Sequence, residues 1–196
     1  MGRGFRNFQL VKRAFDIALS LLLIPVILPI MAVCAIVIRL DSPGPIFHIS
    51  RRVGRKNALF NMPKFRTMQI GTPHVATHLL VNPSKHLTRA GSFLRKTSLD
   101  ELPQIWSVLR GDMSFVGPRP ALFNQLDLVE ARTQWGIDSI RPGITGWAQI
   151  NGRDEISMEK KVELDQEYLI KRSLVFDLKI LLKTAWKAVA SEGISH

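Results

Sequence analysis

The longest stretch of apolar positions lies near the N-terminus, where the 22 residues from Ile17 to Ile38 carry no charged side chain. A helix of this length can span the hydrocarbon core of a bilayer. Pro25 and Pro29 lie inside the stretch, and each removes a helical hydrogen bond and bends the axis. The pattern therefore predicts a membrane-associated helix–break–helix element over residues 1–40.

Basic side chains flank this stretch on both sides: Lys12 and Arg13 precede it, and Arg39, Arg51, Arg52, Arg55 and Lys56 follow it. Flanks rich in lysine and arginine favour the cytoplasmic side of a membrane. If both flanks stay there, the element is re-entrant; a tilted, kinked span is the alternative. Arg13 and Asp16 are close on one helical face, so we expect them to pair as an interfacial anchor.

Beyond residue 40 the pattern predicts a compact, mainly helical domain with a small β-hairpin region, an α+β fold over residues 41–196. Residues 41–45 read as a turn, and residues 46–67 mix β-formers around Gly54, which is typical of a hairpin. Residues 71–85 read as a loop. Residues 88–110 have a helical pattern with a break near Ser98.

Two amphipathic helices are predicted at the C-terminal end, over residues 158–171 and 174–190. The second has an apolar stripe and a basic stripe, formed by Leu174, Leu178, Leu181, Leu182, Ala185 and Val189 and by Lys179, Lys183 and Lys187. This pattern suits a helix lying in a membrane interface, and it suits equally a surface helix packed on a core. Trp186 favours the interface.

Charge supports an anionic partner, because 27 Lys/Arg residues stand against 16 Asp/Glu residues, for a net charge of +11. Such an excess suits nucleic acid, anionic lipid or a phosphorylated substrate. The first 56 residues hold nine of the basic residues and two of the acids, which favours an anionic membrane surface. A nucleic-acid reader would interleave basic and aromatic residues, and this chain does not. The single cysteine, Cys34, excludes a disulfide within the chain.

The densest candidate chemistry lies in residues 97–120. Asp100 and Glu101 are adjacent carboxylates at a helix start, and Arg119 sits in a rigid Gly-Pro-Arg-Pro turn. Ser98 and Glu101 have capping-box spacing, so Glu101 could be a cap, a catalytic group or both. A helix-capping role would account for Glu101 but not for the adjacent carboxylate, Asp100.

A second block, residues 141–153, is glycine-rich and bounded by Arg141 and Arg153, which is a plausible phosphate cradle. His74 and His78 are four residues apart, but no further ligand motif accompanies them, so we interpret this segment as a loop rather than a metal site.

The ordered motifs resemble those of the bacterial sugar transferases, the monotopic polyprenyl-phosphate phosphoglycosyl transferases. The resemblance rests on residues 12–16, 42–47, 52–54, 64–68, 97–104, 111–120 and 141–153. It implies transfer of a sugar-1-phosphate from a UDP-sugar to polyprenyl (undecaprenyl) phosphate, with release of UMP. It also implies Mg²⁺ dependence, a re-entrant membrane helix and a catalytic domain on the cytoplasmic face of the bacterial inner membrane.

The resemblance also implies residue roles. Asp100 would be the nucleophile that carries a covalent phosphosugar and would also bind the metal ion, while Glu101 would act as a base or orient the pair. Substrate phosphates would be bound by basic side chains, namely Lys64, Arg66, Arg95, Arg119, Arg141 and Arg153. The donor sugar and the glycan pathway stay undetermined, and a homodimer is left open.

Two positions depart from the family pattern. Leu28 stands before Pro29 where the family commonly has serine, so the bend in the membrane element could differ in position or shape. Ser50 stands where the family often has glutamine. Because neither touches the Asp100–Glu101 pair, an enzyme is favoured over a catalytically inactive, basic, membrane-binding scaffold.

Overall fold

The computed structural model describes residues 3–73, 82–152 and 156–190. Most of this part of the chain is helical, and the strands form two small two-stranded sheets, so the expected mainly helical α+β class is confirmed. The α-helices are α1 Arg3–Asp41, α2 Arg89–Lys96, α3 Ile105–Arg110, α4 Leu126–Gln134, α5 Trp147–Ile150, α6 Met158–Lys171 and α7 Leu174–Ala190. The strands are β1 Phe47–Val53, β2 Leu59–Phe65, β3 Ser114–Val116 and β4 Gly143–Thr145, and the 3₁₀ turns are η1 Arg55–Asn57, η3 Pro83–His86, η4 Leu99–Gln104 and η5 Ile137–Ser139.

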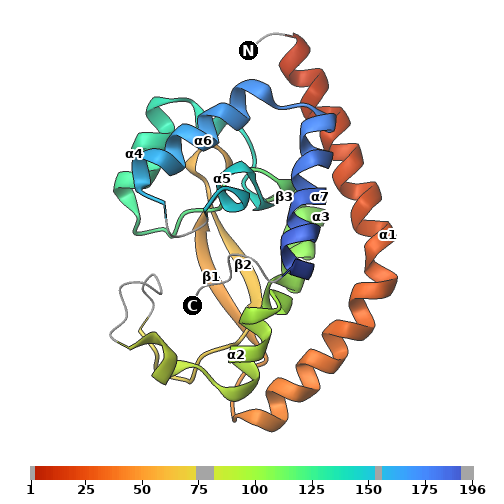
Figure 1. The fold of residues 1–196 in the computed structure, drawn as a ribbon, viewed down its shortest axis with the longest axis vertical. Coiled ribbons are helices and arrows are strands. Elements are labelled where there is room, and N and C mark those ends of the chain that lie inside the picture. Colours follow the sequence, from red (N-terminus) through yellow and green to blue (C-terminus); the bar gives the residue numbers. More distant parts are fainter. Residues whose placement is uncertain (1–2, 74–81, 153–155, 191–196) are drawn as a thin grey trace.

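Helix α1 curves along one side of the molecule and continues through Pro25 and Pro29 (Figure 1). The expected interruption is therefore a bend, because each proline costs one backbone hydrogen bond and tilts the axis without ending the helix. Both prolines are exposed, and only 17% of the most apolar stretch of this helix is buried against the rest of the protein. By length and composition, α1 is the one helix in the described residues that could cross a membrane.

The two ends of α1 pack on the same folded body through different chemistry. Near the start, the buried positions are polar and spaced four apart: Lys12, Asp16 and Ser20. Near the end, they are apolar, namely Met31, Cys34 and Ile38, which pack with Phe65 and Leu94. The middle of the helix, which carries the prolines, is left mostly uncovered.

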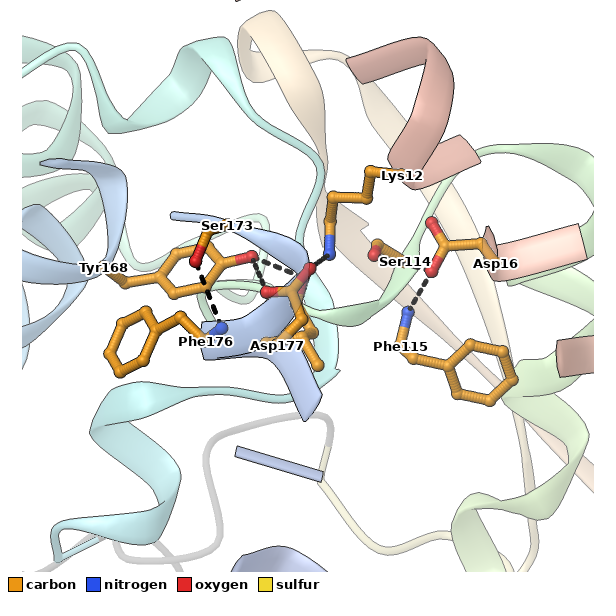
Figure 2. Close-up of polar contacts among 9 residues, drawn as sticks. Lys12, Asp16, Ser114, Phe115, Tyr168, Ser173, Phe176 and Asp177 are labelled. Carbon is orange, nitrogen blue, oxygen red and sulfur yellow. Dashed lines mark hydrogen bonds and ion pairs between the residues drawn. The ribbon is translucent and has the colours of Figure 1, made fainter. Parts of the chain in front are cut away.

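Arg13 and Asp16 bind other elements rather than each other. Arg13 donates to the carbonyls of Val108 and Leu109 at the end of α3. A carboxylate oxygen of Asp16 accepts from the Ser114 hydroxyl at 3.0 Å and the Phe115 amide at 3.2 Å (Figure 2). The predicted Arg13–Asp16 pair is thus wrong, because this face of the helix packs on the protein. Each side chain binds a partner from α3 or β3 instead of its neighbour three residues away.

Lys12 joins α1 to α7 through a buried ion pair. Its ammonium lies 2.5 Å from a carboxylate oxygen of Asp177, and the Tyr168 hydroxyl donates to the other oxygen at 2.7 Å. Figure 2 shows the three side chains converging between α1, α6 and α7. A charge pair with this little water contact holds its helices in one arrangement, since separating it leaves a buried ion unpaired.

The predicted hairpin is formed by β1 and β2, which pair antiparallel from Phe47 opposite Phe65 to Val53 opposite Leu59. Cross-strand partners share a face of the sheet. Ser50, Arg52, Met62 and Lys64 therefore lie on one face. Arg52 and Lys64, from different strands, are thus basic side chains on the same side of the hairpin.

Strands β3 and β4 pair in parallel and approach closely through glycines. A Cβ added at Gly143 would lie 2.1 Å from the Gly117 amide nitrogen, and one at Gly146 would lie 2.1 Å from the Gly117 carbonyl oxygen. Only residues without a side chain permit this approach. The glycines of residues 141–153 thus allow the backbone of this block to pack directly against the segment that follows β3.

The break predicted near Ser98 is confirmed, but the capping box is wrong. Ser98 adopts φ 57°, in the left-handed region, and its side chain makes no capping hydrogen bond. An N-cap serine needs extended backbone for its hydroxyl to reach the helix. Here Ser98 instead ends the turn after α2, and its carbonyl accepts from the Glu101 amide at 3.2 Å.

Helices α6 and α7 have the predicted bounds. Helix α7 buries Asp177 and Ile180 against the core, whereas Val175, Leu182 and Trp186 are more than 70% exposed. Leu178 and Ala185 of the predicted apolar stripe are exposed as well. The side of α7 that faces the core therefore does not coincide with the predicted apolar stripe, and several apolar side chains of the helix are exposed on its outer face.

Candidate active site

Asp100 lies on η4, directly before α3, and its side chain is buried, with 7% of the residue exposed. Burial is the main cause that raises the pKa of Asp100 to about 6, and the neighbouring charge of Glu101 adds to it. Lys64, Arg95 and Arg119 oppose the rise, in that order. Three cations thus surround a carboxylate that ionises close to neutral pH, which suits a nucleophile for an anionic substrate.

Glu101 pairs with Arg119 rather than capping its helix. A guanidinium nitrogen of Arg119 lies 2.9 Å from a carboxylate oxygen of Glu101, and the Arg119 side chain is 39% exposed. The pair brings the Gly-Pro-Arg-Pro turn against η4, although 18 residues separate them in sequence. A partly exposed arginine beside two carboxylates can bind an incoming phosphate.

Lys64 of β2 belongs to the same cluster of charged groups around Asp100 and Glu101. Burial lowers its pKa to about 8, against the opposing effect of Glu101 and Asp100, while Arg119 and Arg52 lower it further. A lysine at this position is charged at neutral pH and loses its proton in mildly alkaline solution.

Arg95 reaches the site from α2. Its Nε donates to the Thr67 hydroxyl at 3.0 Å, and its charge stabilises ionised Asp100. Thr67 follows β2, so this hydrogen bond ties α2 to the hairpin.

Two of the predicted phosphate ligands, Arg66 and Arg141, bind backbone carbonyls rather than Asp100 or Glu101. Arg66 donates to the carbonyls of Ser42 and Pro43, and Arg141 donates to the Gly111 carbonyl at 2.7 Å. Burial lowers the pKa of Arg141, and the neighbouring charges of Arg13 and Arg55 lower it further. Arg153 lies outside the described residues, as do His74 and His78.

Sequence reasoning missed Arg52, which it treated as a flanking charge. Arg52 lies on the same hairpin face as Lys64, lowers its pKa, and donates to the Pro120 carbonyl at 3.1 Å. The hairpin register was the available signal, because residues two apart on a strand and the partners opposite them lie on the same face of the sheet.

The protein supplies only part of the set of ligands that a magnesium ion needs. In the described part of the chain, no three His, Cys, Asp or Glu side chains gather to hold a metal ion. Mg²⁺ is commonly bound by one or two carboxylates together with substrate phosphates. Asp100 and Glu101 are such a pair, so the residues present fit this ion.

A buried carboxylate of near-neutral pKa among cationic side chains is the kind of site expected in an enzyme that acts on phosphates. The profile of the family described as "Bacterial sugar transferase" matches residues 7–191, and the chain belongs to this family.

Two relatives match almost end to end. The "Uncharacterized sugar transferase EpsL" of Bacillus subtilis (strain 168) is 42% identical over 188 residues, which cover 96% of this chain and 92% of that protein. The "Exopolysaccharide production protein ExoY" of Sinorhizobium fredii (strain NBRC 101917 / NGR234) is 34% identical over 93% of this chain and 87% of its own length.

A third relative is longer. The "UDP-glucose:undecaprenyl-phosphate glucose-1-phosphate transferase" of Escherichia coli (strain K12) is 40% identical over 193 residues, which are 94% of this chain. The chain spans 41% of that protein's length.

Proposed function

We propose that this protein transfers a sugar-1-phosphate from a UDP-sugar to undecaprenyl phosphate, by way of a covalent intermediate on Asp100. One observation carries the proposal: Asp100 is buried, ionises near neutral pH, and is faced by Lys64, Arg95 and Arg119. The E. coli relative, named for this kind of reaction, supports the substrate class.

In the first step a carboxylate oxygen of Asp100 attacks the phosphorus that bears the sugar. The bond between that phosphorus and the bridging oxygen breaks, and UMP leaves with the bonding electrons. Lys64, Arg95 and Arg119 neutralise the charge on the phosphoryl oxygens as it shifts toward the leaving group.

In the second step an oxygen of undecaprenyl phosphate attacks the same phosphorus, and Asp100 leaves as a carboxylate. Glu101 either accepts the proton of the incoming phosphate or holds Arg119 in position. Dividing the transfer this way means that the two anionic substrates need not occupy the site together. Mg²⁺ bound through Asp100 and Glu101 would add positive charge on the phosphates.

We infer also that α1 is a re-entrant element at the cytoplasmic face of the inner membrane. Both of its ends pack on one folded body, through Lys12 and Asp16 near the start and Cys34 and Ile38 near the end. A span would carry one end across the bilayer, away from that body. The outward apolar face of α7 would lie in the interface beside it.

Topology is tested with single cysteines at Asn7 and Leu40 in a Cys34→Ala background. Leu40 is 83% exposed, and Asn7 is exposed as well. In inside-out membrane vesicles both should react with an impermeant maleimide, and in intact spheroplasts neither should. Labelling from opposite sides would establish a span instead.

The nucleophile is tested with Asp100→Asn, for which Asp112→Asn is a matched control because Asp112 is an aspartate in a solvent-accessible pair with Arg110. Wild type and Asp112→Asn should release UMP from a UDP-sugar and gain the mass of one sugar phosphate before acceptor is added. Asp100→Asn should do neither and should stay in the membrane fraction. UMP release by Asp100→Asn at the wild-type rate would refute the assignment.

A further inference from the structure

The backbone around Arg119 is held through successive carbonyl groups. The Pro118 carbonyl accepts from the Gly143 amide at 2.9 Å, and the Pro120 carbonyl accepts from Arg52 at 3.1 Å. Between them, the Arg119 carbonyl accepts from Arg132 at 2.7 Å. The side chain of Arg119 therefore projects from a segment whose peptide groups have fixed directions.

Arg132 is itself fixed by Asp165. Its Nε and Nη2 lie 3.0 and 2.6 Å from one carboxylate oxygen of Asp165, and its Nη1 is the atom that binds the Arg119 carbonyl. The two side chains are 9% and 1% exposed. The planar guanidinium thus bridges α6 and the Arg119 peptide in one orientation, which a lysine could not reproduce.

Burying this ion pair costs desolvation free energy, so a contribution to stability does not by itself explain why the pair is there. Taking two charges out of water offsets much of their attraction, and well-packed apolar residues often replace such a pair without loss of stability. Leu128 of α4 and Val162 of α6, each about one helical turn from Arg132 or Asp165, belong to one buried apolar cluster. The pair does something that apolar residues could not do, since only a donor can hold the Arg119 carbonyl.

We propose that Arg132 and Asp165 are positioning residues that hold the Arg119 peptide so that the Arg119 side chain faces both Glu101 and a substrate phosphate. This inference rests on the proposed role of Arg119 in binding phosphate. Neither residue touches the substrate. Their effect on catalysis passes through the direction of one peptide group.

The alternative is a purely structural brace between α4 and α6, and an apolar replacement separates the two roles. In Arg132→Leu/Asp165→Leu, no buried charge is left without a partner, so the melting temperature in detergent should stay close to that of wild type. UMP release should nevertheless fall by roughly tenfold or more, because Arg119 loses its fixed direction.

A double-mutant cycle with Arg119→Ala identifies the route of the effect. If the pair acts through Arg119, the Leu/Leu change should reduce UMP release by less than about twofold when Arg119 is already alanine, because coupled residues are not additive. An equal reduction in both backgrounds would overturn the proposal. So would a Leu/Leu enzyme that is folded and fully active.

Arg55→Leu is the matched control, since Arg55 also donates to a backbone carbonyl, that of Ser139 at 3.0 Å, outside the site. It should leave UMP release unchanged. If Arg119→Ala itself leaves UMP release at the wild-type rate, the phosphate-binding role of Arg119 fails and this inference fails with it. An additive cycle, by contrast, overturns the inference alone.

Discussion

Ionisation of Asp100 should limit the reaction on the acid side, so UMP release should rise with pH through about pH 6. Burial and the Glu101 charge raise the pKa of Asp100 from its ordinary value of 3.8 to about 6. That rise corresponds to about 3 kcal/mol against the charged form. Because the proposed nucleophile is the carboxylate form of Asp100, kcat/KM near pH 5 should be about one tenth of its plateau value.

Glu101→Gln should move this acid limb to lower pH. The substitution removes a like charge next to Asp100 and releases Arg119 from its ion pair, and both changes favour ionised Asp100. A shift of about one unit is expected from a neighbouring carboxylate. Near pH 5 the variant should then retain about half of its own plateau, whatever the height of that plateau.

The assay is kcat/KM for UMP release across the pH range, each enzyme normalised to its own maximum, with Asp112→Asn as the control that keeps the wild-type limb. The reasoning is refuted if the acid limb of wild type lies near pH 4, or if Glu101→Gln leaves the limb in place. On the alkaline side the sign reverses. Burial lowers the pKa of Lys64 to about 8, so the rate should fall as Lys64 loses its charge above that pH.

Three further outcomes are expected. Lys12→Met should destabilise the protein by about 3–5 kcal/mol, because Asp177 is left buried without its ion-pair partner. Lys12→Met/Asp177→Leu should recover most of the lost melting temperature. If the single variant loses no stability, the pair does not hold α1 in place. Gly91→Ala should lower the melting temperature by several degrees, since its Cβ would lie 2.0 Å from the Thr67 carbonyl oxygen, whereas the neighbouring Ser92→Ala should not. Chelation with EDTA should abolish UMP release, and added Mg²⁺ should restore it; full activity after chelation would exclude the proposed ion.

Local pattern was sufficient for much of the secondary structure. The apolar stretch, the hairpin around Gly54, the break at Ser98 and the bounds of α6 and α7 agree with the structure, because each depends on residues close together in the chain. The motif order was sufficient for the family. The Asp100–Glu101 pair and the cations Lys64, Arg95 and Arg119, which we propose as the active site, were also predicted from the sequence, through that resemblance.

Partnerships across the fold did not follow from local pattern. Glu101 had helix-capping spacing, yet it pairs with Arg119, because Ser98 takes a left-handed backbone and the turn after β3 comes alongside η4. Arg13 and Asp16 were neighbours on a helical face, yet α3 and β3 supply their partners.

The sequence by itself determined that this chain has a long apolar helix, a basic surface and an Asp-Glu pair of the bacterial sugar transferase type. The tertiary structure decided which charged groups lie near Asp100 and which face of α7 is buried. It also decided that Arg132, paired with Asp165, binds the Arg119 carbonyl. The physical reason is range. Periodicity and turn chemistry act over a few residues, whereas pKa values and buried ion pairs depend on groups that only packing brings together.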